Sequence, residues 1–156
     1  MVRAFFDDVA DALAGFLPPA MRGFHVRTTA NNVKVWFGTD HHEHFEVQLL
    51  PPAEQRAAGI KATGPALEVG FHAEHPAAAT NDKLLEGLRA REPTLRRSLG
   101  GSLEIGPFVG RRRGWGRASE LWHGDEIDTP ETAIEAAERL ARYIRAIERV
   151  RTRPER

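Results

Sequence analysis

The sequence has no cysteine among its 156 residues, so disulfide bonds and cysteine-based metal sites are both excluded. It also lacks a long apolar run, since no stretch approaches the roughly 18 uninterrupted apolar residues of a membrane-spanning helix. The N-terminal region carries Asp7, Asp8 and Asp11, where a secretory signal would be apolar. These absences predict a cytoplasmic protein that has no membrane partner.

An excess of charge of either sign is also missing. The 22 basic residues balance 22 acidic ones, whereas a general nucleic-acid binder shows a strongly basic domain or face. The charge balance therefore argues against a nucleic-acid partner. What the chain does have is 41% apolar residues, enough for one core, which predicts a single domain over residues 1–150 followed by a frayed basic tail, 151–156.

Apolar residues at intervals of three and four predict amphipathic helices over 4–17 and from Pro130 to Val150, with Thr129 as the N-cap of the second and Ile134 on its apolar stripe. Thr80 or Asn81 is expected to cap a central helix that Pro93 breaks, and a short helix follows over 94–99. Alternating segments predict strands over 24–27, 33–37, 42–50, 66–74, 102–105 and 115–122. Residues 51–65 are expected to form a long loop or a β-excursion.

Hairpin-linked strands are antiparallel neighbours. The sequence therefore predicts an α+β fold with two layers: a mainly antiparallel sheet of five to six strands, with the N-terminal, central and C-terminal helices on one face. This order of helices and strands resembles that of secretion chaperones and YbjN-like proteins. The resemblance is one of topology and implies no particular function.

Two of the predicted strands combine an apolar face with a face rich in imidazole and carboxylate, because residues two apart share a face of a strand. The polar faces carry His42, His44, Glu46 and Gln48 on one strand, and Glu68, His72 and Glu74 on the other. A solvated face of an antiparallel sheet would also alternate in this way. The histidines are the unusual component, since they are suited to metal binding and proton transfer.

The first hypothesis is a binding module without a cofactor, whose open polar face engages a protein or small-molecule partner. Its expected contact residues are Trp36, His44, Glu46, Glu68 and His72. Trp36 belongs to this set because an exposed tryptophan often marks a contact with a ligand or partner. A homodimer is one of the partners that this hypothesis leaves open.

The alternative hypothesis is a metal-dependent hydrolase that binds a divalent ion such as Zn²⁺ or Mn²⁺. Its candidate metal ligands are His42, His44 and His72, and Glu46, Glu68 or Glu74 would complete an open site. Glu46-Val47-Gln48, with Asp40 as a partner acid, resembles the E-x-K or E-x-Q hairpin of metal-dependent nucleases. That resemblance implies a phosphodiester substrate.

One further candidate is the basic segment around Arg111, Arg112 and Arg113. These side chains could hold a phosphate or an acidic partner. The competing interpretation is a flexible loop whose arginines keep a sheet edge soluble.

Overall fold

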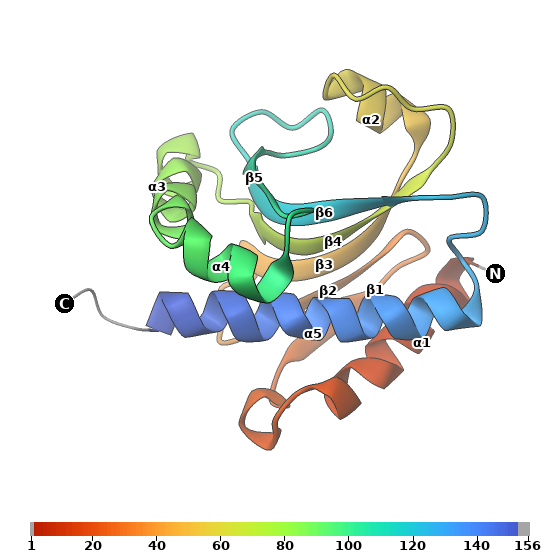
Figure 1. Ribbon diagram of the computed structural model, residues 1–156, viewed down its shortest axis with the longest axis horizontal. Coiled ribbons are helices and arrows are strands. Elements are labelled where there is room, and N and C mark those ends of the chain that lie inside the picture. The colour runs from red at the N-terminus through yellow and green to blue at the C-terminus, as the bar shows by residue number, and fades with distance from the viewer. Residues whose placement is uncertain (1, 153–156) are drawn as a thin grey trace.

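The computed structural model describes residues 2–152 and is built around a six-stranded antiparallel sheet (Figure 1). The strands are β1 (His25–Thr28), β2 (Asn32–Trp36), β3 (Glu43–Leu50), β4 (Ala66–Ala73), β5 (Glu104–Pro107) and β6 (Gly116–His123). Their order across the sheet is β1-β2-β3-β4-β6-β5. The predicted α+β class and antiparallel sheet are therefore confirmed.

The helices are α1 (Val2–Leu13), α2 (Pro52–Ala57), α3 (Ala78–Arg89), α4 (Glu92–Leu99) and α5 (Pro130–Thr152), with two short 3-10 turns, Ala14–Phe16 and Pro19–Met21. Helices α1, α4 and α5 lie along one face of the sheet (Figure 1). Among residues 2–152, no helix has the length and apolar content needed to cross a membrane.

The core lies between the sheet and these helices. Phe45 pairs with Phe71 and Val47 with Val69 across β3 and β4, and all four side chains are buried. Helix α5 meets them with an apolar stripe that includes Leu140, Ile144 and Ile147, as its spacing predicts. The odd-numbered positions of β3 and β4 therefore face the helices, which leaves the even-numbered positions on the opposite face.

That opposite face is covered, which the sequence did not predict. Helix α2 and the segment 108–115 between β5 and β6 lie on the side of the sheet away from α5 (Figure 1). The buried amide of Gln55 in α2 donates to the carbonyl oxygens of Leu50 and Gly64, each at 3.0 Å. These bonds tie residues 51–65 to the sheet, where the proline pair and glycines had predicted an irregular loop.

The central helices begin earlier than predicted. Asn81 lies within α3 instead of capping it, and its buried side chain bonds the backbone of His75 and the carbonyl oxygen of Gly114. Pro93 does not break a helix but sits in the first turn of α4, where a missing N–H has no cost. Asn81 thus connects the end of β4 to the segment that covers the polar face.

The last helix begins as predicted, because the Thr129 hydroxyl accepts a hydrogen bond from the backbone N–H of Thr132 at 3.1 Å. Ile134 does not belong to the buried stripe, since it is 47% exposed. Arg151, the first residue of the predicted tail, lies in α5 and forms an ion pair with Glu43. Residues 153–156 of that tail lie outside the described residues.

Gly70 permits the close approach of β4 and β6. Its φ is +153°, and a Cβ atom there would lie 2.5 Å from the carbonyl oxygen of Ala118 and 2.6 Å from the Cα of Ser119. We expect Gly70→Ala to lower the free energy of unfolding by about 2–4 kcal/mol, measured by urea denaturation. The matched control is Gly87→Ala in α3, where a Cβ meets nothing within 4 Å. If both variants unfold at the same urea concentration, the close approach does not require glycine.

Candidate metal centre

The same three-residue pattern, His-x-Glu, occurs once on β3 and once at the end of β4. His44 and Glu46 form the first pair, and His72 and Glu74 form the second. The ladder places His44 directly opposite His72, so the two glutamates lie on opposite sides of the imidazoles along the strands. The predicted sharing of one face by these side chains is therefore observed.

These side chains are buried, although the sequence had suggested an open face. His44, Glu46, His72 and Glu68 are at most 2% exposed, and Glu74 is 8% exposed. Phe108, from the segment that covers this face, packs its ring against His72 with the centroids 5.2 Å apart. A partner macromolecule therefore has no direct access to the cluster.

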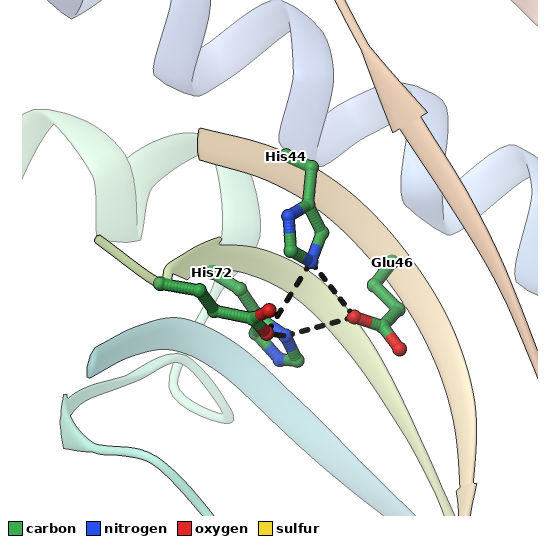
Figure 2. A group of neighbouring side chains, drawn as sticks. His44, Glu46 and His72 are labelled. Atoms are coloured by element: carbon green, nitrogen blue, oxygen red, sulfur yellow. Dashed lines mark hydrogen bonds and ion pairs between the residues drawn. The ribbon is translucent and has the colours of Figure 1, made fainter. Parts of the chain in front are cut away.

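Four ligand-type atoms converge at the centre of the cluster (Figure 2). Nε2 of His44 lies 2.9 Å from Oε1 of Glu46 and 3.4 Å from Oε2 of Glu74. Nδ1 of His72 lies 3.0 Å from each of the same two oxygens. Each nitrogen therefore faces both carboxylates. Ligand atoms at 2.0 Å from a tetrahedral ion lie about 3.3 Å from one another, close to these separations.

The outer nitrogen of each imidazole fixes which nitrogen can carry a lone pair. Nδ1 of His44 lies 2.9 Å from the carbonyl oxygen of His41, which only accepts, so Nδ1 bears the proton. Nε2 of His72 lies 2.9 Å from Oε2 of Glu68. The angle there is too poor for a hydrogen bond, but a lone pair on Nε2 would face the carboxylate and be repelled by it, so a neutral ring carries its proton on Nε2. A neutral imidazole at either position therefore directs its lone pair toward the centre.

The two carboxylates are also held at their outer oxygens. Asn32 of β2 donates to Oε2 of Glu46 at 2.8 Å. Lys34, two residues further along β2, places its Nζ 3.6 Å from Oε1 of Glu74. Outer contacts of this kind orient the ligands of protein metal sites, and here all four candidate ligands have one.

Glu68 connects the cluster to a second group of polar side chains. It accepts hydrogen bonds from Gln48 and from the Ser119 hydroxyl, each at 2.6 Å. Arg117 donates to the same hydroxyl at 2.8 Å and to Glu104 at 3.0 Å. A continuous polar line therefore crosses the sheet from β2 to β5 beneath the covering segment.

The charges along this line do not cancel when both imidazoles are neutral. The four carboxylates of Glu46, Glu68, Glu74 and Glu104 face only two cations, Lys34 and Arg117. The remaining formal charge is −2. Either one divalent ion or two extra protons on the imidazoles would neutralise it.

The pKa shifts of the cluster also indicate that positive charge beside the carboxylates is favoured. Burial alone would raise the pKa of Glu46, but His72 and His44 outweigh that effect and lower this pKa to about 2. Burial would likewise lower the pKa of His72, but Glu68 and Glu46 hold it well above its usual value. With no other cation present, these directions correspond to protonated imidazoles that face ionised carboxylates.

The structure brings together most but not all of the predicted site residues. His44, Glu46, Glu68 and His72 meet, whereas Trp36 lines a cavity beside Glu74. His42 is not part of the cluster, because it lies in the turn before β3 and binds Asp40 with 2.8 Å between Nδ1 and Oδ1. His42 therefore does not join His44 and His72 in one group of ligand-type atoms.

The nuclease-like hairpin does not assemble either. The Asp40 side chain is 53% exposed and pairs with His42, and the amide of Gln48 binds Glu68 instead of facing the centre. In the basic segment, Arg111 lies 3.2 Å from Glu54 of α2 and Arg112 lies 5.0 Å above the ring of Trp115. Arg113 is exposed, and a phosphate at these arginines stays a prediction.

The predicted site residues included Glu74 as a possible metal ligand but omitted the outer partners. The repeated His-x-Glu pattern was a visible signal for Glu74. Asn32 lies two residues before Lys34 and four before Trp36, so the alternation along β2 also predicted that these three side chains share one face of the sheet. Ser119 and Arg117 had no local signal, since the pairing of β6 with β4, strands far apart in the sequence, brings them near Glu68.

Glu68 is the acceptor on which the second polar group depends. Glu68→Ala would remove the hydrogen-bond acceptor of the Ser119 hydroxyl and of the Gln48 amide. It would also remove the ion-pair partner of the His72 imidazole. We expect the free energy of unfolding to fall by about 3–5 kcal/mol, the usual cost of breaking a buried charged pair, as measured by urea denaturation. Glu138→Ala is the control, because Glu138 and its partner Arg142 are half exposed and their pair contributes under about 0.5 kcal/mol. Equal effects of the two variants would show that the polar line does not depend on Glu68.

Comparison with known proteins gives no relative for this chain: no protein-family model, no curated protein and no solved structure matches it. Any proposal about its function therefore starts from the residues described above.

Proposed function

We propose that the protein binds one divalent transition-metal ion through His44, Glu46, His72 and Glu74. The observation that carries this proposal is the convergence of two imidazole nitrogens and two carboxylate oxygens on one point. Two neutral imidazoles and two carboxylates have a charge of −2, which a divalent ion cancels. The mixed nitrogen and oxygen set favours Zn²⁺, with Mn²⁺ as the next candidate.

A pair of protonated imidazoles is the competing explanation for the same cluster. In that case each inner N–H would donate to one carboxylate, His44 to Glu46 at 2.9 Å and His72 to Glu74 at 3.0 Å. The second carboxylate oxygen that faces each nitrogen, at 3.4 Å and 3.0 Å, would receive no aligned proton from it. A metal ion needs no such compromise, because it takes all four atoms as ligands at once. The geometry thus supports a metal better than two protons.

The position of the ion indicates what binding would do. It would join β3 to β4 beneath the segment 108–115, next to Phe108. Four protein ligands with little exposure are typical of a structural metal site, whereas catalytic sites keep a position open. Asp40 binds His42 and Gln48 binds Glu68, so the nuclease-like hairpin contributes Glu46 alone to the centre. We therefore propose metal binding, and not phosphodiester hydrolysis, as the function.

Metal analysis tests the proposal directly. Protein purified without an affinity tag is expected to contain one zinc ion per chain, and metal-stripped protein should gain stability when Zn²⁺ is added. At a hundredfold excess over Kd the gain is about 2.7 kcal/mol, which for a chain of this length raises Tm by roughly 5–10 °C. Glu46→Gln and Glu74→Gln preserve side-chain volume and should each abolish the stoichiometric zinc.

The matched control is His123→Ala, which removes an exposed imidazole at the end of β6 and should leave the zinc content unchanged. Far-UV circular dichroism checks that each variant is folded. A folded wild-type protein that contains no divalent metal, and whose Tm does not respond to Zn²⁺ or Mn²⁺, would show that the cluster is a buried ion-pair network only.

A further inference from the structure

A small cavity lies beside the proposed metal centre, and Glu74 belongs to both. The cavity has a volume of about 200 Å³, and its lining includes Arg27, Lys34, Trp36 and Trp115. Glu74 faces the centre with Oε2 and approaches Lys34 with Oε1. Anything bound in this cavity would therefore lie next to a ligand of the metal.

Two cations stand side by side in this cavity. Arg27 of β1 pairs directly with Lys34 of β2 in the sheet, and like charges at opposed positions repel each other. Lys34 has Glu74 at 3.6 Å, whereas Arg27 forms no ion pair with any carboxylate in the described part of the chain. Arg27 is also exposed, so its guanidinium is accessible to an anion that enters the cavity.

The same cavity has two tryptophans whose rings are fixed by neighbours. Trp36 stacks on His25, with 5.5 Å between centroids and 27° between planes. Trp115 meets Phe108 edge to face with the centroids 5.2 Å apart. Both tryptophans are only partly buried, so each leaves apolar surface for a ligand. Ring surface that is fixed before binding loses little entropy on binding.

We propose that this cavity binds a small aromatic carboxylate, whose anionic group pairs with Arg27 and Lys34 and whose ring contacts Trp36 and Trp115. The volume is below the 300–1,000 Å³ typical of sites for drug-sized ligands, so it suits a molecule with one ring. The inference rests on the proposed function. A metal ion bound to Glu74 would offset the negative charge of this carboxylate in the cavity wall, and an anion in the cavity would then meet less repulsion.

Benzoate is the probe, and binding is measured by isothermal titration calorimetry on protein whose zinc content has first been determined. Benzamide has the same shape without the charge, and acetate has the charge without the ring. We expect benzoate to bind at least tenfold more tightly than either. Inorganic phosphate is the fourth probe, and phosphate binding tighter than benzoate binding would overturn the choice of an aromatic carboxylate.

Arg27→Gln is expected to weaken benzoate binding at least tenfold and to leave the zinc content unchanged, because Arg27 touches none of the metal ligands. Arg142→Gln is the matched control: it removes an arginine that is half exposed on α5 and should alter neither quantity. Benzoate affinity that is unchanged in Arg27→Gln would overturn the assignment of the anion site.

The two proposals fail in different ways. Zinc-containing protein that does not bind benzoate would overturn the ligand inference and leave the metal site intact. Protein without zinc would overturn the metal site whatever the calorimetry gives. Benzoate binding of equal strength with and without zinc would overturn the dependence of the cavity on the metal.

Discussion

Burying three carboxylates on one face of a sheet is the constraint that organises this protein. Glu46, Glu68 and Glu74 are at most 8% exposed, and an ionised carboxylate in such a place needs both charge compensation and hydrogen bonds. Asn32, Gln48 and Ser119 supply the hydrogen bonds. Lys34 and Arg117 supply only part of the positive charge, which leaves the two imidazoles facing the rest.

The carboxylates are shielded from water by two covering segments, α2 and residues 108–115. Without α2 and residues 108–115 over them, the carboxylates would meet water and need no special partners. Phe108 packs on His72, Glu54 of α2 pairs with Arg111 at 3.2 Å, and Gln55 ties α2 to the end of β3. The segments that exclude water are thus held to one another and to the cluster. A cation at the centre would stabilise this whole side of the sheet.

The sequence predicted what depends on local periodicity and missed what depends on distant contacts. The alternation of Phe45, Glu46 and Val47 correctly indicated which side chains share a face. His42 was misplaced because β3 begins one residue later, after a turn in which Asp40 accepts hydrogen bonds from the backbone and ring of His42. The cover over the polar face had no periodic signal, since Gln55 acts through two backbone carbonyls and Phe108 through His72, which lies far from it in sequence.

The geometry of the cluster depends on the apolar face of the same two strands. Along β3 and β4, each candidate ligand is followed or preceded by a core residue: Phe45 separates His44 from Glu46, and Ala73 separates His72 from Glu74. Phe45 and Ala73 are at most 1% exposed, and a tightly packed core residue permits little movement of its backbone. Because the His-x-Glu pattern shares that backbone, helix packing on one face sets the separation of the nitrogens and oxygens on the other. A site on such strands holds its ligand geometry more precisely than a site on loops.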